Sequence, residues 1–175
     1  VFGTPRNRVV LDMLEDGAGG VLVIVQDITA SPPSLWIQRL TSHGTVAPGW
    51  SASGLLIRTA EHIVGCCTLT GGLSAIVAWS ERVGPADENI RAARVNLGGF
   101  LDAAWPAGGL SVETTTANTT DVRIVSDGGT GALIGWMRFP TSLSDPDGAI
   151  FVKHVRSNAT FDPAWPAGGR ALRAP

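Results

Sequence analysis

Apolar and polar positions alternate along several short stretches of this chain. In residues 35–40, Trp36 and Gln38 lie on one face of an extended chain, and Ile37 and Arg39 lie on the other. A period of two is the signature of a half-buried β-strand. Glycine, proline, aspartate or asparagine ends each stretch, as expected where strands meet tight turns. The pattern predicts an all-β chain of short strands.

The same pattern occurs three times. In each copy an Asp-Gly or Gly-Gly turn precedes an apolar run, and a tryptophan followed by glycine closes the unit. Self-similarity at a fixed period is the signature of a repeat architecture. The closing tryptophans are Trp50, Trp105 and Trp165. We therefore expect a single repeat domain over residues 1–175, with units at approximately 6–58, 59–113 and 114–173.

Each unit is expected to hold four strands. The first strands are expected at 8–14, 62–69 and 120–125, the second at 20–26, 73–79 and 131–138, the third at 35–40, 89–95 and 149–155, and the fourth at 54–58, 109–113 and 169–173. The second strand is apolar enough to be buried on both faces, as in a layered stack. The loops before the third strands, at 29–34, 81–88 and 139–148, vary most and are natural places for binding chemistry.

Three motifs recur in order within the units. They are represented by the turn and strand from Asp127 to Trp136, by Gln38-Arg39-Leu40, and by Trp105-Pro106-Ala107-Gly108-Gly109. These motifs resemble the tandem repeats of secreted bacterial β-propeller proteins. Departures from the resemblance are Val25 in place of a tryptophan, Thr70 in place of the turn aspartate, and His154 in place of an arginine. The resemblance implies four-stranded antiparallel propeller-like blades and an extracellular or cell-surface location.

Three blades leave two faces without a neighbour. A closed propeller usually has four to eight blades, because each sheet must pack against another on both sides. We therefore expect the end faces to expose apolar residues that the middle unit buries. Such a chain pairs into a six-bladed ring, forms an open assembly, or belongs to a longer polypeptide. Self-association is thus the expected interaction, with the chain itself as partner.

A β-trefoil is the alternative architecture, because it also has three repeats of four strands and closes within one chain. Two features count against it. The units are long, and the Gln-x-Trp signature of carbohydrate-binding trefoils is missing, since neither Gln26 nor Gln38 precedes a tryptophan by two.

Bulk composition narrows the classes of partner. The chain has 175 residues, a formal net charge of −2 and only 16% charged residues, which disfavours nucleic acid. No apolar run approaches the roughly 20 residues of a membrane span, so membrane insertion is not expected. The first residue is Val1, which indicates a processed or trimmed product.

The sequence contains no recognisable catalytic or metal motif. His43, His62 and His154 occupy different positions in their units, so no catalytic residue is assigned and no enzymatic activity is expected. Asp145 and Asp147 open like a calcium loop but lack the later acidic ligand, which favours an ordinary turn. The adjacent Cys66 and Cys67 would point to opposite faces of a strand, which disfavours a disulfide between them and predicts one buried and one more exposed thiol. No metal or cofactor is expected.

The closing tryptophans are the best candidate binding residues. A ring formed by Trp50, Trp105 and Trp165 would suit stacking on sugar faces, but recurrence at one position is also what packing requires, and packing is favoured. The sequence thus predicts a non-enzymatic extracellular module for self-assembly or ligand display. The alternative is a lectin-like carbohydrate-binding protein, and a glycan hydrolase is third.

Overall fold

The computed structural model describes residues 7–29, 31–71, 73–82, 88–115, 117–140 and 148–172. These residues form strands, turns and loops, with no helix among them. Accordingly, no helix in the described ranges is long and apolar enough to cross a membrane. The all-β class expected from the sequence is confirmed.

The first and last sheets have four antiparallel strands each, in sequence order. The first sheet contains β1 (Arg8–Glu15), β2 (Val21–Asp27), β3 (Ser34–Leu40) and β4 (Leu55–Thr59). The last sheet contains β10 (Asn118–Ser126), β11 (Ala132–Phe139), β12 (Ala149–Val155) and β13 (Arg170–Ala171). The expected meander of four strands is therefore correct for both, although β13 is shorter than the expected strand at 169–173.

The middle sheet divides its fourth position between two strands. Its members are β5 (His62–Thr70), β6 (Ser74–Arg82), β7 (Glu88–Asn96), β8 (Phe100–Leu101) and β9 (Leu110–Thr115). Both β8 and β9 pair with β7, each along a different part of it. The two-residue β8 was not expected, because so short a pairing leaves no periodic pattern in the sequence.

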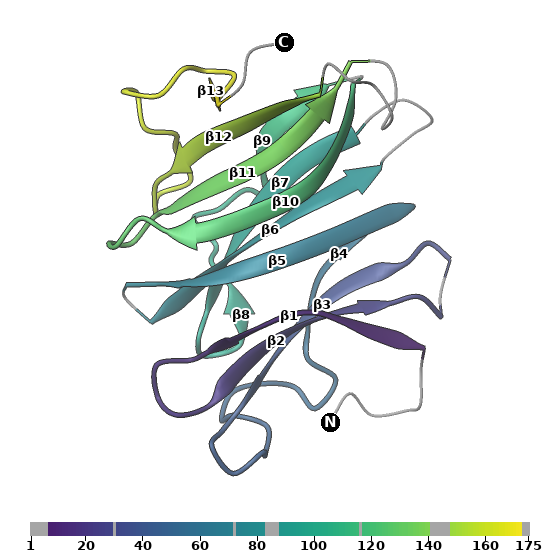
Figure 1. Cartoon of the computed structure of the whole chain (residues 1–175). Coiled ribbons are helices and arrows are strands. Elements are labelled where there is room, and N and C mark those ends of the chain that lie inside the picture. Colours follow the sequence, from purple (N-terminus) through teal and green to yellow (C-terminus); the bar gives the residue numbers. More distant parts are fainter. Residues whose placement is uncertain are drawn as a thin grey trace.

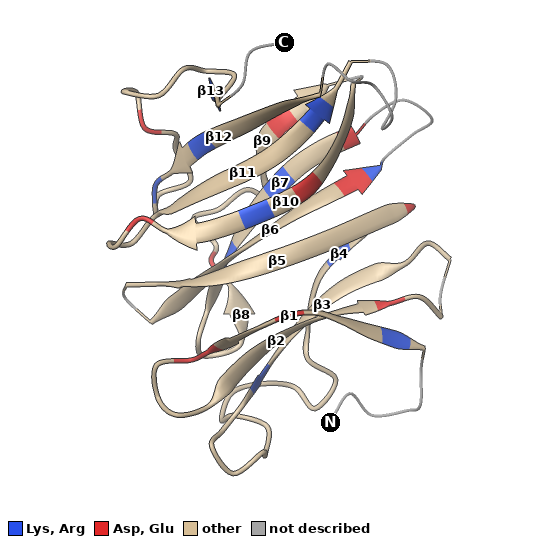
Figure 2. Ribbon diagram, in the orientation of Figure 1, with Lys and Arg blue, Asp and Glu red and all other residues tan. Residues whose placement is uncertain are grey.

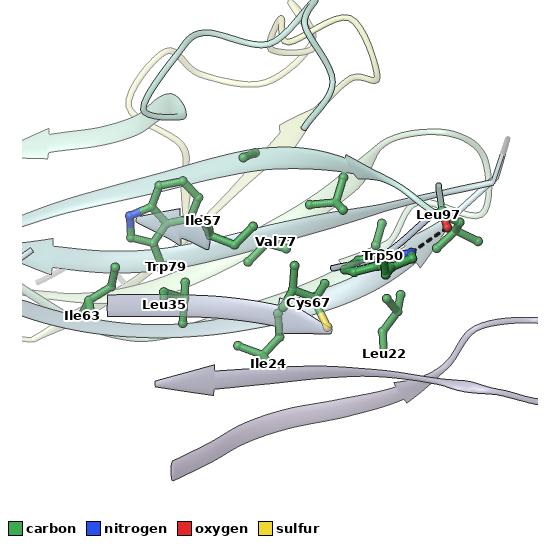
Figure 3. Packing of buried hydrophobic residues seen from close by; sticks show 14 of the residues in the cluster. Leu22, Ile24, Leu35, Trp50, Ile57, Ile63, Cys67, Val77, Trp79 and Leu97 are labelled. Atoms are coloured by element: carbon green, nitrogen blue, oxygen red, sulfur yellow. Dashed lines mark hydrogen bonds between the residues drawn. The ribbon is translucent and has the colours of Figure 1, made fainter. Parts of the chain in front are cut away.

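The three sheets lie in layers, with β5 between β1 and β10 (Figure 1). One apolar cluster joins the first and middle sheets and includes Ile24, Ile37 and Trp79; Figure 3 shows part of it. A second cluster joins the middle and last sheets and includes Ile76 and Trp136. The middle sheet is therefore covered on both faces.

The layering excludes the alternative fold and corrects one expectation about the second strands. No strand of the described residues pairs with a strand of another sheet, so the single closed barrel of the alternative β-trefoil does not form. Every residue of β6 up to Glu81 is buried, as expected for a second strand, but along β11 buried and partly exposed residues alternate. Partly exposed residues of β11 such as Leu133 lie on the face without a neighbouring sheet. On β2, by contrast, Leu22–Val25 are all buried, although the first sheet also has a neighbour on one side only.

Candidate functional site: the sheet interfaces and the end faces

The three closing tryptophans occupy the same local structure. The backbone N–H of each tryptophan donates a hydrogen bond to the carbonyl three residues earlier, at Ala47, Asp102 and Asp162. The N–H groups of those three residues in turn donate to the carbonyls of Arg39, Arg94 and His154, near the ends of the third strands. The loop that carries the tryptophan is therefore fixed by its own backbone in all three units.

Two of the tryptophans connect one sheet to the next. The Trp50 indole N–H donates to the Leu97 carbonyl at 2.8 Å, a bond drawn in Figure 3. The Trp105 N–H donates to the Ser157 carbonyl at 2.9 Å. Trp50 and Trp105 are 7% and 6% exposed. Since a buried indole N–H needs an acceptor, these bonds fix how neighbouring sheets are placed.

Trp165 differs from the other two. It is partly exposed, and its indole N–H has no acceptor among the described residues. Its ring lies beside two residues of its own unit, with the His154 ring edge-on at a centroid distance of 6.2 Å and the Arg170 guanidinium at 5.7 Å. The last unit thus carries the same tryptophan, but no following sheet among the described residues supplies an acceptor for its indole N–H.

A polar cluster closes the turn of the first sheet. One carboxylate oxygen of Asp16 accepts hydrogen bonds from the backbone N–H groups of Ala18 and Gly20. The other oxygen accepts a hydrogen bond from Arg39 Nε at 2.8 Å. Arg39 also donates to the Leu97 carbonyl of the middle sheet. Burial raises the pKa of Asp16, but the backbone hydrogen bonds and Arg39 outweigh it and hold that pKa below its ordinary value.

The last sheet has a histidine where the first has Arg39. His154 Nε2 lies 2.8 Å from an Asp127 carboxylate oxygen, and its Nδ1 lies 3.0 Å from Asp162. Arg156 donates to the other oxygen of Asp162 at 3.0 Å. The histidine is therefore held between two carboxylates of its own unit.

Both carboxylates titrate below their usual range. The hydrogen bond from His154 is the largest influence on Asp127 and lowers its pKa from the ordinary 3.8, and two turn glycines lower it further against partial burial. The pKa of Asp162 is lowered first by the backbone N–H of Ala164, and then by His154 and Arg156. A carboxylate with a lowered pKa stabilises the fold only while it is ionised.

Acid should therefore weaken the last sheet in a way that depends on His154. The stabilisation from both carboxylates is present above about pH 4 and is lost as the pH falls through their lowered pKa values. Replacing His154 by glutamine is expected to raise the pKa of Asp127 toward 3.8 and to make the acid-side loss of unfolding free energy less steep. Carboxyl carbon NMR and urea unfolding between about pH 2 and 6 measure the two effects.

Asp16 provides the internal control for this pH prediction. Its carboxylate pairs with Arg39 and not with a histidine, so its pKa should stay the same in the His154→Gln protein. If the pKa of Asp127 also stayed the same, the hydrogen bond to His154 would not be the cause of its shift.

The middle sheet has the least complete version of this cluster. Thr70 stands at the position of the turn aspartate, and its hydroxyl donates to the Ser74 carbonyl. Arg94 contacts Asp102 at 3.3 Å through one terminal nitrogen, while its buried Nε has no hydrogen-bond partner in the described ranges. The loss of the turn aspartate thus accounts for an unsatisfied nitrogen.

A second set of ion pairs lies at the other end of the strands. Glu81 is fully buried at the end of β6. Its carboxylate accepts hydrogen bonds from Nε of Arg58, on the first sheet, at 2.7 Å and from Nε of Arg91 at 2.6 Å. At the interface between the middle and last sheets the charges are exchanged: the earlier sheet supplies the acid, Glu113 of β9, and the later sheet supplies the base, Arg138 of β11, at 3.6 Å. Figure 2 shows charged positions near these strand ends on ribbons that are otherwise mostly uncharged. Charge pairs therefore help to align each sheet with the next.

The outer faces of the first and last sheets have no neighbouring sheet. On the first sheet, Val10, Val25, Trp36 and Leu56 are paired across the four strands and so share a face. This is the face opposite Ile24 and Ile37, and we call it the first end face. Val25 is itself covered at 2% exposure, whereas Val10 and Leu56 are 58% and 43% exposed.

The corresponding surface of the last sheet, the last end face, lies opposite Trp136 and Phe151. It carries Leu133, Met137 and Ile150, and Ile150 is 42% exposed. Leu172, which follows β13, is 64% exposed. Both ends of the stack therefore expose apolar side chains of the kind that the middle sheet buries.

A cavity of about 300 Å³ lies beside one of the sequence-predicted binding residues. Ile57, Arg94, Leu101, Asp102 and Trp105 contribute to its walls. Trp105 is nonetheless buried, and its indole N–H donates to the Ser157 carbonyl, so only part of this indole faces the cavity. Of the three predicted tryptophans, Trp50 and Trp105 are packed between sheets and Trp165 is partly exposed.

The described residues that the sequence singled out for metal chemistry are not gathered into one cluster. No cluster of histidine, cysteine or acidic side chains suited to a metal ion occurs among the described residues. Asp145 and Asp147 lie outside those residues. Cys66 and Cys67 are free and point to opposite faces, as expected, but both are buried, so the expectation that one is more exposed is wrong.

Burial also makes the two thiols unreactive. It raises the pKa of Cys66 to about 12 and raises that of Cys67 as well, with nearby Asp12 adding to both shifts. Because the thiolate is the reactive form, neither is a nucleophile at neutral pH. Cys66 instead donates to the Val122 carbonyl of the last sheet, at 3.3 Å.

No protein-family model matches the chain, and neither a curated protein nor a solved structure matches it. The resemblance to bacterial propeller repeats therefore remains an expectation from the motifs.

Proposed function

We propose that the chain is a non-enzymatic, β-propeller-like structural module of the cell surface or extracellular space that assembles with copies of itself. The observation that carries this proposal is the contrast between the middle and outer sheets. The middle sheet packs against an apolar cluster on each face, although Val64 and the short strand β8 stay exposed, whereas each outer sheet has a neighbour on one side only and exposes apolar residues such as Val10, Leu56 and Ile150 on the other. Apolar surface of this kind is usually covered by a partner.

The site chemistry also favours assembly over catalysis. The main polar clusters of the described residues form ion pairs and hydrogen bonds that hold turns or join sheets, as at Asp16, Glu81 and His154. A lectin-like role has one supporting observation, the cavity beside Trp105. Stacking a sugar on that indole would require surface that the sheet interface already covers, so assembly is the better supported function.

The proposal predicts the mass of the protein in solution. At micromolar concentration, we expect dimers or larger assemblies by light scattering and native mass spectrometry, with dissociation on dilution. Electron microscopy of the same sample would distinguish a closed ring from a filament. A monodisperse monomer over the whole range of concentration would contradict the proposal.

A further inference from the structure

The hydrogen bond made by the indole N–H of the closing tryptophan recurs at both interfaces between sheets and is missing at the end of the stack. Trp50 donates to a carbonyl of the middle sheet, and Trp105 donates to the equivalent carbonyl of the last sheet. Trp165 has the same backbone bonds around it as the other two. Its indole N–H is therefore a preformed donor without an acceptor among the described residues.

The matching acceptor is present at the other end of the stack. Leu97 and Ser157, the two acceptors, lie two residues after Val95 and Val155, and Ser42 lies two residues after Leu40 at the corresponding position of the first unit. Leu40 pairs with Val46 just as Val155 pairs with Phe161, six residues on.

The turn that holds Ser42 also has the same hydrogen bonds as the turn that holds Ser157. Thr41 N–H donates to Thr45 and Gly44 N–H donates back to Thr41, and the same two bonds join Arg156, Thr160 and Ala159. The Ser42 residue is exposed, and its carbonyl accepts no backbone bond in the described structure. This carbonyl is thus presented in the way that Ser157 presents its own to Trp105.

The two end faces also correspond to opposite sides of the repeated sheet. Val25 of the first end face stands where Trp79 and Trp136 stand in the other units, and those two residues pack toward the preceding sheet. The last end face carries Leu133, which corresponds to Ile76, a residue that packs toward the following sheet. Continuing the stack therefore places a last end face on a first end face, and not like on like.

We propose that two copies of this chain join head to tail, with the last end face of one copy on the first end face of the other and the Trp165 indole N–H donating to the Ser42 carbonyl. This inference rests on the proposed self-assembly and specifies its geometry. The contact is heterologous, so a two-fold arrangement closes a ring of six sheets, another rotation that divides a full turn closes a larger ring, and a rotation that misses closure produces an open filament.

A phenylalanine at position 165 tests the hydrogen bond. Trp165→Phe keeps an aromatic ring but removes the indole N–H, and should raise the dissociation constant about fivefold for each junction. Trp105→Phe removes the equivalent bond inside the chain, so it should lower the stability to urea while leaving the dissociation constant unchanged. Sedimentation equilibrium measures association, and circular dichroism measures unfolding.

Blocking one face at a time tests the head-to-tail geometry. Leu56→Glu places a charge on the first end face and Ile150→Glu places one on the last, both at exposed positions, so each variant should fold and remain monomeric. Mixing the two leaves one intact face of each kind and should produce a 1:1 dimer that grows no further. Native mass spectrometry separates this dimer from monomers.

The outcomes distinguish this inference from the proposed function. If the unmodified protein is a monomer, both are wrong. If it assembles but Leu56→Glu alone still dimerises, like faces pair and the head-to-tail geometry is wrong while self-assembly stands. If the mixed dimer forms but Trp165→Phe binds as tightly as tryptophan, the assigned hydrogen bond is wrong.

Discussion

Replacing Glu81 by leucine is expected to destabilise the protein by about 3 kcal/mol, or roughly 10 °C in melting temperature. The carboxylate is fully buried and accepts hydrogen bonds from Arg58, Arg91 and the Trp79 indole N–H. Leucine would leave two guanidinium groups side by side and the indole N–H without its acceptor. Because both guanidinium groups retain some contact with water, the expected cost is at the lower end for a broken buried pair. Urea unfolding followed by tryptophan fluorescence measures it.

Glu113 provides the matched control for Glu81. It lies at the neighbouring interface with the charges exchanged, but its ion pair among the described residues, to Arg138, has a distance of 3.6 Å. Burial is the largest influence on Glu113 and raises its pKa, which further reduces the importance of this pair. Glu113→Leu should therefore cost about 1 kcal/mol or less. Equal losses at the two positions would show that the network around Glu81 is not specially stabilising.

The strands themselves could be predicted because their signals are local. Alternation and turn residues indicated a third strand at 149–155, and the structure has β12 at Ala149–Val155. A second strand expected at 20–26 is observed as β2, Val21–Asp27. In both cases a strand depends on the residues within it and on the turns that bound it. The same reasoning could not identify β8, whose two residues carry no period.

The interfaces between sheets were less predictable because their partners are distant in sequence. Glu81 was assigned to a variable loop at 81–88, yet it lies in β6 and its partner Arg58 is on another sheet. Recurrence of the tryptophans indicated packing, which is found for Trp50 and Trp105 but not for the partly exposed Trp165, and only the stacking of sheets reveals Leu97 as the acceptor for Trp50. The replacement at His154 was visible in the repeat, whereas its two aspartate partners required coordinates.

Replacing Gly109 by alanine is the second substitution with a large expected effect. This glycine ends the Trp-Pro-Ala-Gly-Gly motif of the middle unit and has a φ of +90°, which is unfavourable for other residues. A Cβ there would lie 2.5 Å from Cη2 of Trp79 and 3.1 Å from the Ala92 carbonyl oxygen. Since Trp79 is fully buried, its ring has no free space into which to move. We expect a loss of about 3 kcal/mol in unfolding free energy, measured by urea denaturation.

Gly168 and Gly169 separate the two causes of this loss. A Cβ on Gly168 would meet no atom within 4 Å, so Gly168→Ala should change stability by less than about 0.5 kcal/mol. Gly169 has a φ of +83°, but its Cβ would lie 3.1 Å from Trp136, so Gly169→Ala should fall between the other two. This order would show that the second glycine of the motif provides room for the buried tryptophan of its own sheet. If Gly109→Ala were no more damaging than Gly169→Ala, backbone conformation alone would explain the glycine.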